Sequence, residues 1–455
     1  MKKLSLPLFG DTYHKGLFEK KIKDGDKIIS RIHLRIDDDG TGILWVNANQ
    51  TFYLNSSAGL MTWALMNNKT EKEIHQIFKK IYPKDFEQVS ADFKVFAPQI
   101  RDLLDGKSDV CDLCQSGISS SMPFSKVPSA PYRMDLALTY GCNNECGHCY
   151  NEKQRTGKTV SVESWKKILR KIAKAGIPHV VFTGGEPTLF PGLFDLLTEA
   201  ENLGLVTGLN TNGRTLKDNS FVKELENRKL DHIQITLESD SAEIHDAMVG
   251  NKGSWEETVA GIQNAVRTSM FIMTNTTLLR SNATPEKIVS LLRFLAELGV
   301  QNVGMNALIY SGSGKEVDTG LDESELPPLL KIAEKTCIEN QQYLTWYTPT
   351  EYCYFNPLDY DLGVKGCSAA RYSMCIEPDG SVIPCQSWYE TIGNILTDPW
   401  EKIWNAPLCQ DIRNRKFIAE DCKKCDLLEI CGGGCPLAKD FKPPVKPQRS
   451  IPADF

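Results

Sequence analysis

The stretch LALTYGCNNECGHCYN, residues 136–151, places three cysteines directly after an apolar run that has the character of a β-strand. Cys142, Cys146 and Cys149 follow the spacing CxxxCxxC, and the sequence provides no fourth cysteine nearby. Three thiolates on one loop suit a cubane iron-sulfur cluster, which normally takes four cysteine ligands, so one iron would stay open to an external ligand. The alternative is a zinc site completed by His148 or by a distant residue.

Length and composition indicate a folded protein of several domains. The chain has 455 residues, of which 41% are hydrophobic and 24% are charged, both ordinary values for a globular protein. A net charge of -6 and a pI near 5.8 argue against nucleic-acid binding. No apolar run reaches the roughly 18 residues of a membrane span, and the N-terminus does not read as a signal peptide. We therefore expect a cytoplasmic protein without a membrane or nucleic-acid partner, in which most of the fifteen cysteines serve metal binding rather than disulfides.

Strand and helix patterns alternate through the middle of the chain. Strand candidates cover residues 134–141, 179–186, 205–213, 232–239, 271–279 and 302–310. Helical patterns separate them at about 162–175, 191–203, 216–229, 254–269 and 284–299. This alternation predicts an α/β fold with a parallel sheet and right-handed crossovers. Six units are too few for an eight-stranded barrel, so we expect a partial (β/α)6 TIM-like barrel with its chemistry at the C-terminal strand ends.

The remaining chain divides by composition. We expect a winged-helix domain at 1–105, a linker rich in Ser, Gly and Pro at 106–130, the barrel at 131–311, a bridging region at 312–365, a cysteine-dense domain at 366–440 and a basic tail at 441–455. The winged-helix prediction rests on three strands between residues 28 and 55 followed by three helices. Thr70 and Glu73 form a capping box ahead of the second helix, and the third is expected to start at Ser90.

A glycine-rich motif, TGGEPTL at residues 183–189, ends the second barrel strand. Gly184 and Gly185 allow a close approach of the backbone to a ligand, and Glu186 offers an acceptor for an ammonium group. A glycine pair in isolation usually marks an ordinary turn. One strand downstream of CxxxCxxC, however, the motif is a specific signal.

With these two motifs the sequence resembles the radical SAM superfamily. The resemblance implies that Cys142, Cys146 and Cys149 hold a [4Fe-4S] cluster whose open iron binds the amino and carboxylate groups of S-adenosyl-L-methionine, which an electron cleaves to a 5'-deoxyadenosyl radical. It implies further that the GGEP segment, Gly184, Gly185, Glu186 and Pro187, binds the methionine amino group. By strand order Asn212 and Glu238 are candidates for the ribose side of the cofactor, with Asn275 nearby; the alternative for each is a strand-end cap. His148 departs from the family, which often has an aromatic residue there.

A second group of cysteines lies near the C-terminus. Cys367 and Cys385 flank Gly380 with the spacing Cx12Gx4C, and Cys422, Cys425, Cys431 and Cys435 follow as CxxCx5CxxxC. Zinc could explain one CxxC pair, but it does not easily explain the ordered set.

The set resembles the SPASM extension of radical SAM enzymes, which implies two auxiliary [4Fe-4S] clusters and so three clusters in the chain. Cys367, Cys385 and Cys435 would hold the first auxiliary cluster, with Cys375 as its fourth ligand. Cys422, Cys425 and Cys431 would hold the second. The last cysteine of the family pattern is missing, because no cysteine follows Cys435. Asp440, Cys409 or Cys353 could substitute for it, or one iron could stay open.

The other cysteines have simpler interpretations. Cys337 and Cys409 lie in helical patterns and are expected to be small buried apolar residues. Cys111 and Cys114 form a CxxC in the linker, which is either a metal or redox pair or an incidental one.

The N-terminal unit resembles the small winged-helix domain of peptide maturases, in which a leader peptide adds a strand to the sheet edge and packs against the third helix. The rival is a DNA-binding winged helix. Residues 1–106 carry 16 Lys plus Arg against 14 Asp plus Glu, a net charge of +2, and the third helix is not basic. So small a positive charge is poorly suited to binding the phosphates of DNA, so we favour peptide recognition.

Together the resemblances imply a maturase of a ribosomally synthesised precursor peptide that takes electrons from a flavodoxin- or ferredoxin-type donor. We favour a thioether crosslink from cysteine to a carbon. The alternatives are carbon-carbon crosslinking, decarboxylation or epimerisation of a peptide, or an oxidation of the sulfatase-activating or haem-pathway kind. The non-enzyme alternative is a zinc-binding winged-helix regulator.

Overall fold

The structure is a computed structural model that describes residues 15–25, 27–47, 50–105, 128–151 and 158–438. The chain forms two units: one contains residues 1–122 with the short stretches 170–179 and 204–206, and the other contains the rest. Most of the expected linker, with Cys111 and Cys114, lies outside the described residues. So do the whole expected tail and Asp440 at the end of the expected cysteine-dense domain.

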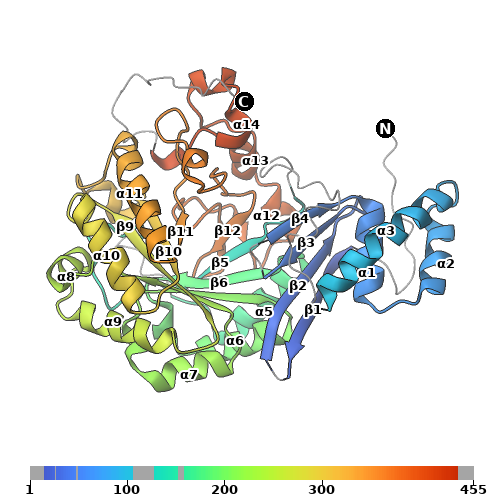
Figure 1. Cartoon of the computed structure of the whole chain (residues 1–455), viewed down its shortest axis with the longest axis horizontal. Coiled ribbons are helices and arrows are strands. Elements are labelled where there is room, and N and C mark those ends of the chain that lie inside the picture. Colours follow the sequence, from blue (N-terminus) through green and yellow to red (C-terminus); the bar gives the residue numbers. More distant parts are fainter. Residues whose placement is uncertain (1–14, 26, 48–49, 106–127, 152–157, 439–455) are drawn as a thin grey trace. The chain divides into compact units, whose positions relative to one another are not determined.

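The N-terminal unit is an antiparallel sheet followed by three helices (Figure 1). Its strands, in sheet order, are β1 (Gly16–Asp24), β2 (Lys27–Ile36), β3 (Gly42–Val46) and β4 (Gln50–Leu54). Its helices are α1 (Ser56–Met66), α2 (Glu71–Ile81) and α3 (Phe86–Leu104). The capping box of Thr70 and Glu73 is confirmed, whereas β1 was not predicted and α3 begins earlier than Ser90. One hydrophobic cluster, whose buried members lie between Ile22 and Leu104, holds the sheet and helices together.

Six consecutive strands form the centre of the larger unit, which confirms the predicted partial barrel. They are β5 (Arg133–Thr139), β6 (His179–Gly184), β7 (Val206–Thr211), β8 (His232–Thr236), β9 (Phe271–Leu278) and β10 (Asn302–Ala307), and they lie side by side in sequence order. The helices between them are α5 (Val162–Lys174), α6 (Leu193–Asn202), α7 (Asn219–Asn227), α8 (Ala242–Val249), α9 (Ser254–Ala265) and α10 (Pro285–Glu297). These helices cover the outer face of the curved sheet (Figure 1). The short helix α8 was not predicted.

The sheet continues beyond the barrel on both sides to ten strands. After α11 (Leu326–Glu339), the strand β11 (Tyr343–Trp346) pairs in parallel with β10. On the other side β12 (Ser373–Ile376) pairs in parallel with β5, and β13 (Ser381–Ile383) and β14 (Gly393–Asn394) follow as antiparallel strands. The C-terminal helices are α12 (Trp400–Trp404), α13 (Pro407–Arg413) and α14 (Leu428–Cys431). The cysteine-dense region thus shares a sheet with the barrel.

Among the described residues, no helix has the length and apolar character needed to cross a bilayer.

Candidate active site

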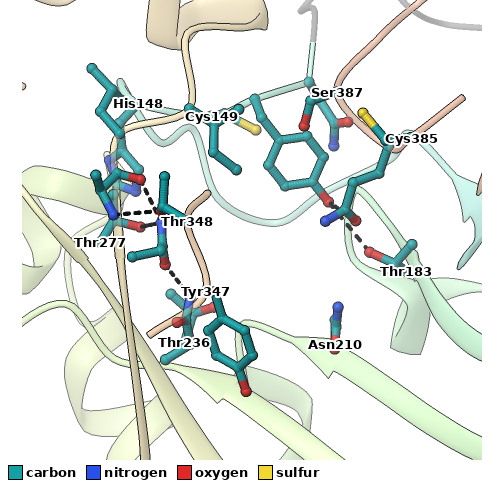
Figure 2. A pocket seen from close by; sticks show the side chains of 18 of the residues that line it. His148, Cys149, Thr183, Asn210, Thr236, Thr277, Tyr347, Thr348, Cys385 and Ser387 are labelled. Atoms are coloured by element: carbon teal, nitrogen blue, oxygen red, sulfur yellow. Dashed lines mark hydrogen bonds between the residues drawn. The ribbon is translucent and has the colours of Figure 1, made fainter. Parts of the chain in front are cut away.

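A cavity of about 1070 Å³ opens at the C-terminal ends of the barrel strands. Two groups of cysteines meet there: Cys142, Cys146 and Cys149 from the loop after β5, and Cys367, Cys385 and Cys435 from the C-terminal region. Figure 2 shows the side chains of Cys149 and Cys385 at the same end of the cavity. The structure therefore brings together residues that lie more than two hundred positions apart in the sequence.

The thiols of the first group lie close to one another. Burial, followed by the nearby Cys149 thiol, the Glu238 carboxylate and the Cys142 thiol, raises the pKa of Cys146 well above its usual value. Burial also raises the pKa of Cys142. Grouped thiolates of this kind are unfavourable unless a cation lies among them, and cluster iron is such a cation. The donor set therefore fits the implied [4Fe-4S] cluster.

The loop that carries these cysteines is held by the barrel helices. Arg214 donates a hydrogen bond of 2.9 Å to Asn144 Oδ1, and its Nε lies 2.6 Å from Glu257 of α9. The backbone of Glu145 donates to the carbonyl of Val249, the last residue of α8, at 2.9 Å. The cluster loop is thus anchored between Cys142 and Cys146.

The GGEP segment lies against the end of β5. Gly185 N donates to Thr139 O at 2.7 Å, and Glu186 N donates to Gly141 O at 2.9 Å. Gly184 has a φ of +125°, which an L side chain rarely adopts. Both glycines line the cavity beside the cysteine loop, as the motif predicted.

The side chain of Glu186 is turned inward and is fully buried. Its carboxylate accepts hydrogen bonds from Thr188 Oγ1 and Thr211 Oγ1, each at 2.7 Å, and from Asn212 N at 2.8 Å. Pro187 begins a short 3-10 helix at Pro187–Leu189 and is also buried. Neither residue is among those that line the cavity, so the geometry favours a role for Glu186 in fixing the GGEP loop, and its contact with an ammonium group stays a prediction.

We predict that Gly185→Ala weakens binding of S-adenosyl-L-methionine. A Cβ atom at Gly185 would lie 2.4 Å from Gly141 O and 2.7 Å from Tyr140 O, closer than real Cβ atoms come, so the segment must move. Overpacking of this kind costs on the order of 1–3 kcal/mol, which corresponds to roughly five- to 150-fold in affinity if the bound state carries the whole cost. Gly147→Ala is the matched control, because Gly147 lies in the cysteine loop and a Cβ there meets nothing within 4 Å. Equal affinities of the two variants by equilibrium binding would contradict the prediction.

Asn212, Glu238 and Asn275 all line the cavity, as their strand-end positions suggested. Asn212 donates from Nδ2 to Asn143 Oδ1 at 2.6 Å, which places it beside the cysteine loop. Asn275 donates to Asn306 Oδ1 at 2.7 Å, while its own buried Oδ1 has no hydrogen-bond partner among the described residues. A buried acceptor without a partner at a cavity wall is suited to a ligand donor. The assignment of these residues to the cofactor remains a prediction.

His148, the departure from the family pattern, pairs with Glu238. Its Nε2 lies 2.9 Å from Glu238 Oε1, and the other carboxylate oxygen of Glu238 accepts from Thr277 N at 2.7 Å. Burial acts to lower the pKa of His148, but the Glu238 carboxylate outweighs it and raises the pKa above its usual value. Figure 2 shows His148 at the cavity wall near Thr277.

The second group of cysteines continues the cavity wall. Burial raises the pKa of Cys385 to about 12, and the thiol of Cys435 contributes in the same direction. Cys367 lies near both thiols, and its pKa is raised by burial first and then by Cys435 and Cys385. Cys375, the predicted fourth ligand, lies on β12, where it packs against Ala137 and Ile383. Its thiol is near Cys385 but does not line the cavity, so its ligation stays a prediction.

The third set, Cys422, Cys425 and Cys431, lies away from the cavity lining. Burial raises the pKa of Cys422, with further contributions from Glu351, Cys431 and Cys425, so these thiols are also neighbours. In the described part of the chain, no three His, Cys, Asp or Glu side chains converge as the ligands of one metal ion do. Each cysteine of a cubane cluster binds a different iron, so cluster ligation does not require that convergence.

Several polar residues of the cavity were not predicted. Arg133 and Asp135 of β5 form an ion pair, with Arg133 Nη2 donating to Asp135 Oδ2 at 3.3 Å. Asp135 Oδ1 lies 3.0 Å from Arg133 Nε without forming a hydrogen bond among the described residues. Asn210, Gln234 and Tyr347 line the same cavity, and Figure 2 shows Asn210 and Tyr347 below Cys149 and Cys385 in the view. The sequence does show polar residues at every second position of otherwise buried strands. A single sequence does not show whether these polar residues face the cavity or the helices.

Comparison with known proteins agrees with this geometry. Residues 136–295 match the radical SAM superfamily, and residues 367–426 match the SPASM iron-sulfur cluster-binding domain. An AdoMet-dependent heme synthase of Methanosarcina barkeri is 25% identical over 322 residues, which cover 67% of this chain and 91% of the relative. A PqqA peptide cyclase of Gluconobacter oxydans is 27% identical over 320 residues, which cover 68% of this chain and 86% of the relative.

Solved structures show the same fold over more of the chain. Streptococcus suis SuiB bound to S-adenosylmethionine has a TM-score of 0.70 and 19% identity, with 90% of this chain and 96% of that chain covered. SuiB bound to its precursor peptide SuiA has a TM-score of 0.68 and 18% identity, with 93% of this chain and 97% of that chain covered. At this identity the likeness concerns the fold.

Proposed function

Because the chain carries a radical SAM domain and a SPASM iron-sulfur domain, we propose that it is a maturase that crosslinks a ribosomally synthesised precursor peptide. It is a radical SAM/SPASM enzyme, and its cofactors are S-adenosyl-L-methionine and [4Fe-4S] clusters. When bound, the cofactor supplies a radical that removes a hydrogen atom from the substrate. The observation that carries the proposal is the cavity of about 1070 Å³ that both the radical-SAM cysteines and Cys367, Cys385 and Cys435 enter.

A peptide substrate is favoured over a small molecule. Relatives of both kinds exist, a heme synthase and a peptide cyclase, and each matches about two thirds of the chain. The fold likeness to SuiB covers 90% or more of the chain, and SuiB was solved with a precursor peptide. The N-terminal unit has its own hydrophobic core and a sheet with edge strands β1 and β4, as strand addition by a peptide requires.

The favoured bond is a thioether between a substrate cysteine and a carbon. Its formation breaks one C–H and one S–H bond and makes one C–S bond, so one hydrogen leaves as an atom and the other leaves as a proton and an electron. The cavity supplies what this balance needs. Cys367, Cys385 and Cys435 form part of its wall, and the auxiliary cluster that they would hold would supply an electron acceptor there; Asp135 is a buried carboxylate in the same wall. We propose that Asp135 accepts the proton.

The product distinguishes the candidate reactions. Incubation of the reconstituted enzyme with its precursor peptide, followed by mass spectrometry, should show the loss of two hydrogens per crosslink. A thioether consumes the thiol, so the product should no longer react with iodoacetamide, whereas a carbon-carbon crosslink leaves the thiol reactive. Loss of carbon dioxide, or an unchanged mass with inverted stereochemistry, would instead establish decarboxylation or epimerisation and overturn the crosslink proposal.

The N-terminal unit is proposed to bind the leader of the precursor peptide, in a cytoplasmic enzyme reduced by a flavodoxin- or ferredoxin-type protein. Deletion of residues 1–105 should raise the peptide concentration needed for half-maximal rate by about tenfold or more, because main-chain pairing at the sheet edge is lost. Peptide-independent formation of 5'-deoxyadenosine serves as the internal control, because the cysteines and the GGEP loop proposed for cofactor cleavage lie outside the deleted part. Unchanged processing of full-length precursor by the truncated enzyme would rule out leader recognition by this unit.

A further inference from the structure

The turn at residues 350–354 packs against the third set of cysteines. Tyr352 N lies 3.4 Å from Cys431 Sγ and donates to it, and Cys431 Sγ in turn lies 3.7 Å from Thr350 O. A Cβ atom added to Gly434 would come within 2.9 Å of Glu351 Cγ, so the glycine turn after Cys431 lies directly on this segment. The segment precedes the SPASM match, which begins at residue 367.

This turn carries Cys353, an exposed residue whose thiol lies near those of Cys431 and Cys422. Burial raises the pKa of Cys353 to about 12, and the charges of Glu351, Cys431 and Cys422 act in the same direction. Tyr352 helps to fix the turn, because it is buried and accepts at its hydroxyl from Lys365 N at 2.8 Å. Tyr354, on the other side of Cys353, lines the large cavity. Cys353 is therefore held at a defined place beside Cys422 and Cys431.

In the described part of the chain, two further cysteines lie outside the predicted clusters, and they are placed differently. Cys409 is fully buried on α13, its Sγ lies 3.8 Å from Ile403 O, and the charged neighbour that affects its pKa is Arg413. Cys337 is buried on α11, and burial alone raises its pKa, to about 12. Neither shares the surroundings of the third set.

We propose that Cys353 is the fourth thiolate ligand of the cluster held by Cys422, Cys425 and Cys431. It takes the place that the SPASM pattern gives to a later cysteine, which this chain lacks after Cys435. The inference rests on the SPASM domain and not on which bond the enzyme forms. Binding exchanges the thiol proton for an Fe–S bond, and the cluster then has four thiolates and no position open to substrate.

This ligation has a structural consequence. The ligand comes from the segment that follows β11, where Tyr347, Thr348 and Pro349 also line the cavity. Because Cys353 precedes the SPASM match, its ligation would attach the cluster to the segment after β11, a strand that pairs with β10 of the barrel. A closed, cysteine-ligated cluster at this place is suited to carrying electrons, since ligand identity and solvent exposure set its potential.

The test uses the full-length chain, reconstituted anaerobically, with Cys353→Ala, Cys353→Ser and the control Cys409→Ala. Three clusters correspond to about twelve irons per chain. Cys353→Ala should lose about one to four of them and show a [3Fe-4S] signal by electron paramagnetic resonance or the loss of one reduced-cluster signal. Cys353→Ser, which can ligate through oxygen, should retain more iron and shift the midpoint potential of that signal. Cys409→Ala should match the wild type.

Wild-type iron content, spectrum and potentials in Cys353→Ala would overturn the proposal. A wild type with only about four irons would overturn both this proposal and the auxiliary clusters, so the two failures are distinguishable. If Cys353→Ala does not fold, alkylation of the wild type decides. Cys353 should be protected from iodoacetamide in the holoenzyme and become reactive once the iron is chelated, and equal reactivity in both states would refute ligation.

Discussion

Replacement of Cys142, Cys146 or Cys149 by alanine is expected to abolish cleavage of S-adenosyl-L-methionine and to remove about four irons from the chain. Each variant leaves two thiolates at the end of β5. The cavity offers no substitute ligand at the same place among the described residues, because His148 is paired with Glu238 at 2.9 Å and the next cysteines belong to the C-terminal group. The measurement is anaerobic formation of 5'-deoxyadenosine, with iron and sulfide analysis of the same samples.

Cys337→Ala is the control for this set. Cys337 is buried on α11 and, in the described part of the chain, does not line the cavity. Its variant should keep both the iron and the cleavage activity, so that a loss seen in the three cluster variants reports ligation rather than the removal of any cysteine. Formation of 5'-deoxyadenosine at the wild-type rate by Cys149→Ala would show that the loop does not hold the cluster.

The regular part of the fold was predictable because its sequence signal is strong. β5 to β10 each carry buried apolar residues that recur along the strand, and helices with clear periodicity separate the strands. The elements that were missed have weak signals. β1 reads GLFEKKIKD, where charged residues obscure the alternation, and β11 to β14 are four residues or shorter.

The site was predictable to the extent that its residues are contiguous. The loop of Cys142 and the GGEP segment are local motifs, and the structure places both at one cavity. Contacts between distant segments were not predictable. Cys431 and the turn at 350–354 meet across almost eighty residues, and the choice between Cys353 and Cys409 depends on that contact. The role proposed for Asp135 likewise depends on which face of β5 it occupies, and the sequence alone does not show that face.

Asp135→Asn is expected to lower formation of the crosslinked peptide by about 10²- to 10⁴-fold, the range typical of losing a positioned proton acceptor. The carboxylate is 2% exposed, and Arg133 engages it through one hydrogen bond and one short contact. Its Oδ1 has no hydrogen-bond partner among the described residues, so it can accept a substrate proton. Asparagine keeps the shape but cannot take up that proton, whereas cofactor cleavage without peptide should continue, because the cysteine loop and the GGEP segment are untouched.

Measuring both crosslinking and peptide-independent cofactor cleavage distinguishes a loss of catalysis from a loss of folding. Asp195→Asn, at an exposed position of α6, is the matched control and should leave both activities unchanged. Arg133→Gln should reduce crosslinking less than Asp135→Asn does, because the carboxylate remains, although its position is less fixed. If Asp135→Asn lost cofactor cleavage as well, the residue would be structural. If it formed crosslinked peptide at the wild-type rate, the proton acceptor would have to be another group, and the assignment of Asp135 would be wrong.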